Sequence, residues 1–266
     1  MGRGPVARSL LVMVLGWCWS AALAQTAASA GAPPKVILFV HQQMLPGKAD
    51  EREKLEMEVC RKYEEYSVPI PWIEMESLTG PPQALFLDPA SSFEEIDRAG
   101  QLLSEVYTAH PELAQLQDEI EARIEKSKNV FAVRRDDLGS GHERIDLSKA
   151  HYLRITVVSV RPGHEADYVQ ADNLRRRTRP DALWVVYEVD SGAALPTFLT
   201  METLPSLADL DKKAGTTAGE KERKQMEQIA GDAYVSVESN LYAMHPEMSR
   251  VSRAFADGDP AFWGRK

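Results

Sequence analysis

The chain has 266 residues, of which 44% are hydrophobic and 27% charged, the proportions of an ordinary globular protein. It carries 40 acidic and 31 basic side chains, a formal net charge of −9, and this acidic balance disfavours binding to the phosphate backbone of nucleic acid. The one basic cluster, Arg175 to Arg177 with Arg179, comes just before Pro180. We interpret it as the C-terminus of a helix, with an anion site as the alternative.

Residues 1–24 are predicted to be a secretion signal. Arg3 and Arg8 precede an apolar stretch, 9–23, that is short for a membrane span, and a small-residue motif ends at Ala24. Cleavage after Ala30 and an uncleaved membrane anchor are the alternatives. We therefore expect a periplasmic or secreted protein with a mature net charge of −11, because the signal contains two arginines and no acidic residue. Cys60 would be its single cysteine, which excludes an intrachain disulfide, and its apolar helical surroundings predict burial.

The next elements follow from apolar periodicity and from turn residues. Residues 25–34 are expected to form a flexible leader. The predicted elements of the first half are a strand over 35–43, a helix over 49–66, a hairpin of 70–78 with 84–87, a helix over 92–107, a helix opened by Pro111, and a closing strand over 129–133. Ser92 and Glu95 have the spacing of a capping box at the start of the second helix.

A polar, glycine-bearing linker over 139–149 separates this half, 35–138, from a second half over 150–248 with the same element order. The predicted elements of the second half are a strand over 152–160, a helix over 165–177, a hairpin of 183–189 with 197–201, a short helix from Ser206, a long helix over 218–238, and a last strand over 240–244. The tail, 249–266, is irregular. Its Phe262 and Trp263 are interpreted as packing anchors.

The two halves share a sequence repeat. Trp72, Glu76 and Gly80 recur as Trp184, Glu188 and Gly192 at a constant offset of 112 residues. Further matches follow in order with small drifts of the offset; they join Phe86-Leu87 to Phe198-Leu199, Ala99-Gly100 to Ala214-Gly215, 128–132 to 239–243, and Pro46-Gly47 to Pro162-Gly163. An ordered series of this kind indicates an internal duplication.

Each half therefore reads β-α-β-β-α-β, the ferredoxin-like plan. A sheet of this plan that is apolar on both faces needs a second sheet to cover it, and the two halves can cover one another. We predict an α+β fold with two ferredoxin-like units in tandem, forming an intramolecular α+β barrel. At this point the chain resembles the dimeric α+β-barrel superfamily. The first-strand turns at Leu45-Pro46-Gly47-Lys48 and Arg161-Pro162-Gly163-His164-Glu165 resemble NIPSNAP-type and antibiotic-biosynthesis-monooxygenase-type members.

The resemblance implies several possible activities, among them cofactor-free oxygenation, haem degradation, haem-peroxidase chemistry and isomerisation. The superfamily also includes members with no known catalysis. Haem-degrading members use an Asn, a Trp and a histidine on a helix. Asn129 and Asn240 lie at the last strand of their halves, and His164 lies at the very start of its helix, so this set is not matched. The sequence leaves the cofactor unknown.

Three titratable residues are candidate catalytic groups: His41, Glu76 and Glu188. His41 lies near the end of the first predicted strand, where the second copy of the repeat has the non-titrating Val157, and histidine changes charge near neutral pH. Trp72 shares a strand face with Glu76, and Trp184 with Glu188. If these glutamates lie in a cleft or in the barrel, burial raises their pKa toward a value useful in acid–base catalysis. The alternative makes every tryptophan a core residue and every glutamate a strand-end surface group.

Trp72, Trp184 and Tyr187 are the candidate substrate-binding residues. No histidine pair has metal-ligand spacing, and no nucleophile elbow or phosphate loop is present in the sequence, so no metal site is predicted. We expect a monomer with a pseudo-dimeric core that binds a small apolar or aromatic molecule in an apolar cavity and is monooxygenase-like. The alternative is a non-catalytic binding or protein-interaction module.

Overall fold

The computed structural model describes residues 31–211 and 217–264. The predicted signal and residues 25–30 of the predicted leader lie outside these residues. The elements are β1 Val36–Met44, α1 Ala49–Glu65, β2 Ile73–Ser77, β3 Gln83–Ala90, α2 Phe93–Ala109, α3 Pro111–Glu121, β4 Ile124–Arg134, η1 His142–Arg144, η2 Leu147–Lys149, β5 Tyr152–Val160, α4 Glu165–Thr178, β6 Trp184–Ser191, β7 Thr197–Leu204, α5 Ala208–Asp211, α6 Thr217–Ala230, β8 Tyr234–Met244, η3 Pro246–Met248, α7 Arg253–Ala256 and α8 Pro260–Trp263.

The eight strands close into one barrel in the order β1-β3-β2-β8-β5-β7-β6-β4. The first half contributes β4-β1-β3-β2 and the second half β8-β5-β7-β6, and they join where β2 pairs with β8 and β4 with β6. Every neighbouring pair is antiparallel. Consequently β1, β2, β5 and β6 all run the same way and finish at the same end of the barrel. The predicted mixed α+β fold with a closed barrel is confirmed.

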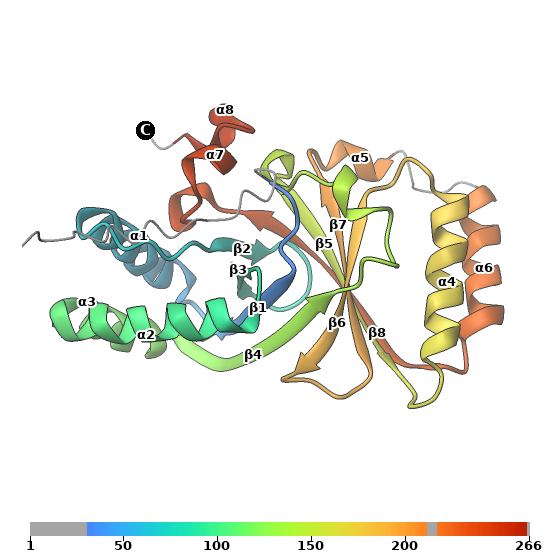
Figure 1. Cartoon of the computed structure of the whole chain (residues 1–266), viewed down its shortest axis with the longest axis horizontal. Helices are drawn as coiled ribbons and strands as arrows, with labels where there is room; N and C mark the ends of the chain where they lie inside the picture. Colours follow the sequence, from blue (N-terminus) through green and yellow to red (C-terminus); the bar gives the residue numbers. More distant parts are fainter. Residues whose placement is uncertain (1–30, 212–216, 265–266) are drawn as a thin grey trace, which may run out of the picture.

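Side chains alternate along each strand between the inside of the barrel and its outer face. The inside is an apolar core; among its buried members are Ile37, Phe39, Met75, Leu85, Leu153, Ile155, Tyr187 and Tyr242. Figure 1 shows the helices outside the barrel, with α1, α2 and α3 beside the first half and α4 and α6 on the opposite side, beside the second half. The outer face of each half therefore lies between strands and helices.

Local signals account for the start of α2. The Ser92 hydroxyl accepts a hydrogen bond from the Glu95 backbone N–H, as the predicted capping box requires. The Glu95 carboxylate reaches back one residue further than the motif predicts and accepts from the Ser91 backbone N–H at 2.7 Å. Cys60, on α1, is buried as expected.

The long helix predicted over 218–238 is wrong in its second part. Helix α6 ends at Ala230, the Gly231 backbone N–H donates to the Glu227 carbonyl at 2.8 Å, and β8 begins at Tyr234. The helical spacing of Ala233 and Val237 is coincidental, because Val235 and Val237 are alternate residues of a strand and are 62% and 57% exposed. Both closing strands begin earlier than predicted.

The segment after β4 and the C-terminal tail close the end of the barrel where β1 begins. Ile145 and Leu147 from the predicted polar linker are buried in the barrel core. Trp263 is buried against the same core, and its indole N–H donates to the Ser148 carbonyl at 2.7 Å, so its predicted role as a packing anchor is confirmed. Within residues 31–211 and 217–264, none of the helices combines the length and the apolar character needed to cross a membrane.

Candidate functional site

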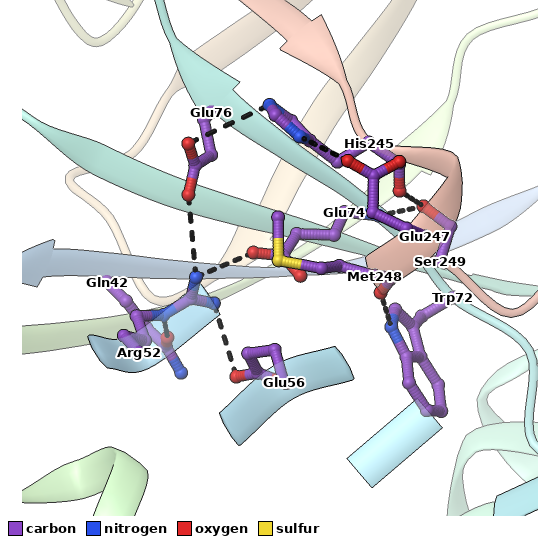
Figure 2. A network of polar contacts seen from close by, with 10 residues as sticks. All are labelled: Gln42, Arg52, Glu56, Trp72, Glu74, Glu76, His245, Glu247, Met248 and Ser249. Atoms are coloured by element: carbon purple, nitrogen blue, oxygen red, sulfur yellow. Dashed lines mark hydrogen bonds and ion pairs between the residues drawn. The ribbon is translucent and has the colours of Figure 1, made fainter. Parts of the chain in front are cut away.

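A buried network of charged side chains lies beneath α1 on the outer face of the first-half sheet (Figure 2). Its centre is Arg52 on α1, which has no exposed surface. The guanidinium donates to Glu74 Oε1 at 2.7 Å, to Glu56 Oε1 at 3.2 Å and to Gln42 Oε1 at 3.1 Å. Although burial lowers the pKa of Arg52, the carboxylates of Glu74 and Glu56 raise it overall, so the guanidinium stays charged.

Two carboxyl oxygens of this network are buried without a hydrogen-bond partner among the described residues, Glu74 Oε2 and Glu76 Oε1. The Glu76 oxygen lies 3.7 Å from Arg52 Nη1. Burial raises the pKa of Glu74 well above its usual value and raises that of Glu56, in both cases against the attraction of Arg52. One guanidinium cannot neutralise three carboxylates, so the network holds protons at pH values where exposed glutamates have lost them.

The C-terminal segment after β8 forms the open edge of the network. Burial also raises the pKa of Glu76, and His245, whose Nε2 lies 3.7 Å from Glu76 Oε2, partly offsets this. The Trp72 indole N–H donates to the Met248 carbonyl at 2.8 Å, and the Glu74 backbone N–H donates to the Ser249 hydroxyl at 2.9 Å. Glu76 and His245 are the members of the network that solvent reaches.

A second part of the same outer face continues from the network toward α2. Strand register places two rows of side chains on this face. One row is Asp88 of β3, Leu38 of β1 and Phe131 of β4. The other row is Glu74 of β2, Phe86 of β3 and Val40 of β1. We name this surface the Asp88 face; its members are Leu38, Val40, Phe86, Asp88 and Phe131, and each of them is only half-buried. Helix α2, which begins directly after β3, has no buried residue at all. The helix therefore covers these strands incompletely.

Asp88 is the titratable group of this surface. Burial alone raises the pKa of its carboxyl to about 7, and no described side chain hydrogen-bonds to it. The surrounding side chains are apolar, with Arg52 Cζ 5.3 Å from the centre of the Phe86 ring and Phe93 of α2 in an edge contact with Phe131. A carboxyl in such a place changes charge near neutral pH.

The second half lacks this feature. Phe198 and Thr200 stand where the sequence repeat puts Phe86 and Asp88, and both are buried. The Tyr168 ring stacks on Phe198 at 4.0 Å, and the Tyr168 and Thr200 hydroxyls are hydrogen-bonded at 3.0 Å. The outer face of the second half is therefore filled by α4 at the position where the first half is half-exposed.

The structure separates the residues predicted from the sequence. Trp72 and Glu76 lie on the outer face of the first half, where Trp72 packs edge-on against Tyr63. Trp184 is fully buried on the outer face of the second half, with its indole N–H donating to Asp172 at 2.8 Å. Glu188 lies nearer the surface and pairs with Arg135 at 2.7 Å.

His41 and Tyr187 lie on the inner face instead. His41 alternates with Gln42, which points outward to Arg52, and its ring makes an edge contact with the core residue Tyr242. Tyr187 is fully buried and donates to the Pro34 carbonyl at 2.9 Å, at the end of the barrel opposite His41. The six predicted residues thus do not converge on one pocket.

Sequence reasoning missed Arg52, Glu74 and Asp88. In the sequence, the charged residues of α1 look solvent-facing and Asp88 looks like the end of a strand. The one signal of a buried polar site was Glu74, a charged residue in the middle of an apolar strand.

Among the described residues, no group of three His, Cys, Asp or Glu could hold a metal ion. Two surface hollows, of about 500 and 270 Å³, lie outside the barrel at the base of α4 and α6 and beside the tail.

Comparison with known proteins supports the fold. No family model matches the chain, and no curated protein matches it by sequence. Solved structures do match. An anthrone oxidase-like protein superposes with a TM-score of 0.54 at 14% identity, over 81% of this chain and 93% of its own. A protein from Fusobacterium nucleatum, provisionally assigned as a monooxygenase, superposes with a TM-score of 0.52 at 11% identity, over 79% of this chain and 93% of its own. At such identities the likeness concerns the α+β-barrel fold. The NIPSNAP resemblance stays a prediction.

Proposed function

We propose that this protein binds a small, largely apolar aromatic molecule at the Asp88 face and carries out acid–base chemistry of the monooxygenase type there. The observation that carries the proposal is Asp88, a carboxyl with a pKa of about 7 and no hydrogen-bond partner among the described residues, surrounded by half-exposed apolar side chains. Ligand sites are mostly apolar surfaces with a few convergent polar groups, and perturbed pKa values gather in them. The anthrone oxidase-like and monooxygenase-type neighbours give the reaction class by analogy.

The chemistry follows from the protonation state of Asp88. A general base works best when its pKa is close to the working pH, and the Asp88 carboxylate meets this condition. It would accept a proton from an acidic O–H or C–H bond of the substrate and leave an electron-rich anion. Dissolved dioxygen is then the oxidant: one of its oxygen atoms bonds to the substrate carbon, and the other leaves as water with the proton that Asp88 gives back. The protein supplies the base. Phe86 and Phe131 offer the aromatic surface on which the substrate ring packs.

The buried network holds Phe86 in place. Arg52 is fixed by three acceptors, and its guanidinium lies over the Phe86 ring. The catalytic roles predicted for Glu76, Glu188 and His41 and the binding roles of Trp72, Trp184 and Tyr187 remain predictions. Of these residues, Trp72 and Glu76 lie on the same outer face as the proposed site, since Glu74, which lies between them in the sequence, pairs with Phe86.

The test compares the purified protein with two variants on a panel of phenols and quinols, with oxygen uptake and ligand binding as readouts. Asp88→Asn should abolish turnover, whereas the wild-type rate should rise with pH through about 7. Asp190→Asn, at an exposed strand position, is the matched control and should leave both readouts unchanged. Binding without oxygen uptake would favour the non-catalytic module. The absence of both binding and turnover would overturn the proposal.

Two further expectations join this proposal. We infer that the chain is a tandem duplication of a ferredoxin-like unit, which is supported by the constant offset of the repeated Trp, Glu and Gly and by the same strand order in both halves. We also infer export by the segment 1–24. Mass spectrometry of the mature protein would check the second point, because retention of Met1 with no cleavage after Ala24 or Ala30 would contradict it.

A further inference from the structure

His41 occupies the inner face of the barrel at the end where β1, β2, β5 and β6 finish. Its neighbours on adjacent strands are Leu85 of β3 and Lys128 of β4. The opposite end is closed by Trp263 and the segment around Leu147, and Figure 1 shows α7 and α8 gathered there. His41 is half-buried, so solvent reaches this end of the barrel.

One ring nitrogen of His41 is committed and the other is not. Nδ1 lies 3.1 Å from the Gln83 carbonyl oxygen Oε1. Because that oxygen only accepts, Nδ1 carries the proton, and Nε2 is left with a lone pair. Nε2 has no partner among the described residues. Burial lowers the pKa of the imidazole, with Lys128 acting in the same direction and the Gln83 hydrogen bond and Glu238 against it, so the ring is neutral at pH 7.

The two charged groups that act on the imidazole are opposite in sign. The Tyr242 ring lies 6.5 Å from the imidazole in an edge arrangement. Lys128 and Glu238, which flank the ring from β4 and β8, carry opposite charges and act on it in opposite senses. An ionic ligand would gain little net attraction here.

The rim of the same end carries three exposed leucines beside polar side chains such as Gln43 and Lys126, which pair two residues further along the face of His41 and Lys128. Leu45 follows β1, Leu78 follows β2 and Leu195 precedes β7, so antiparallel pairing puts all three at the end of the barrel where His41 lies. They are 36%, 50% and 55% exposed. Large apolar side chains at such exposure offer contact surface to an aromatic ring. The end of the barrel therefore combines one free hydrogen-bond acceptor with exposed apolar side chains at its rim.

We propose that the His41 end of the barrel is a second small-molecule site, distinct from the Asp88 face, which takes a neutral phenol whose hydroxyl donates to His41 Nε2. The site lies on the inner face of the sheet, whereas Asp88 lies on the outer face, so neither proposal depends on the other. Gln83 is its positioning residue, because its carbonyl fixes the tautomer that leaves Nε2 free.

The experiment follows the ring resonances of the histidines by NMR while phenol is added to the full-length protein at pH 7. The His41 signal is assigned by loss in His41→Gln. It should shift and saturate, whereas the signal of His164, an exposed ring paired with Asp167 at 2.8 Å, should stay in place. Toluene, which has no donor, should bind roughly five- to tenfold more weakly. The charged analogue 4-hydroxybenzoate should also bind more weakly than phenol.

Two variants separate this site from the Asp88 face and from a general loss of structure. Asp88→Asn should leave the His41 titration unchanged. Gln83→Leu should weaken phenol binding several-fold and shift the tautomer signature of the ring nitrogens, while the rest of the spectrum keeps its native dispersion. The proposal would be overturned if His41 failed to saturate, if His41 and His164 shifted together, or if toluene titrated the ring as strongly as phenol.

Discussion

Arg52 Nη1 lies 2.7 Å from Glu74 Oε1, and neither side chain has any surface exposed to solvent. The pair joins α1 to β2 beneath the helix, with Glu56 and Gln42 as further partners of the same guanidinium. A buried pair of this kind gains little over an apolar replacement, because both charges have lost their hydration. Removal of one partner alone strongly destabilises the fold, because the other charge stays buried without a counter-charge. This difference gives the first prediction.

Arg52→Met should reduce the free energy of unfolding by roughly 3–5 kcal/mol, because Glu74 and Glu56 lose their cation while they remain buried. The loss should grow as the pH rises, since protonated carboxyls need no cation. Urea unfolding at several pH values measures it. Arg52→Met combined with Glu74→Leu should recover much of the loss, and a loss below about 1 kcal/mol for the single variant would contradict the burial of the pair.

Trp184→Ala should cost roughly 3–5 kcal/mol of stability, because a fully buried ring leaves a cavity and Asp172 loses a hydrogen-bond donor. Trp72→Ala should cost a similar amount, since its indole N–H binds the C-terminal segment at Met248. Thermal and urea unfolding check both variants. If either substitution changed stability by less than about 1 kcal/mol, that ring would not be part of the core.

Asp88→Asn should change how stability depends on pH. The carboxyl has an ordinary pKa of 3.8 when unfolded and one of about 7 in the fold, so the native state holds the extra proton between these values. Stability must therefore fall as the pH rises from about 4 to about 7. The variant should lack the part of this fall that Asp88 causes and be more stable than wild type at pH 8 by at least about 1 kcal/mol. Parallel urea titrations from pH 4 to 8 provide the comparison; identical curves would refute the shifted pKa.

Glu188→Gln should change the free energy of unfolding by less than about 1 kcal/mol, because its partner Arg135 is solvent-accessible and also bound to Asp137. Chemical denaturation with and without added salt measures this. A larger loss, insensitive to salt, would show that Glu188 carries structural weight that its position near the surface does not explain.

Most of the architecture could be predicted from the sequence because β1, α1, the hairpins and α4 are regular amphipathic or apolar segments with ordinary stop signals. The boundary between α6 and β8 could not be predicted, because a helical spacing continues across it by coincidence in Met226, Ile229, Ala233 and Val237. The repeat alignment was also off by one residue in the last strands. It matches Phe131 to Tyr242. In the structure Phe131 points outward, as its neighbour Leu38 does, whereas Tyr242 points inward, as its neighbour Leu153 does.

The site was less accessible to sequence reasoning, because a side chain's face depends on register and its burial on the helix above it. The in-out alternation along the strands of His41 and Glu76 can be predicted from the sequence. Nothing in the sequence says which strand face is the barrel core and which lies under α1. Asp88 and Thr200 occupy matching positions in the repeat. Only the packing of α2 and α4 makes one half-exposed and the other buried.

The two seams of the barrel, β2 with β8 and β4 with β6, join strands of a single polypeptide. Closure is therefore a first-order event, and dilution, which takes apart a barrel built from two separate chains, leaves this one intact. A cut in the segment between β4 and β5 would leave the halves held together by noncovalent contacts alone, chiefly the two seams, and concentration would then matter for the first time.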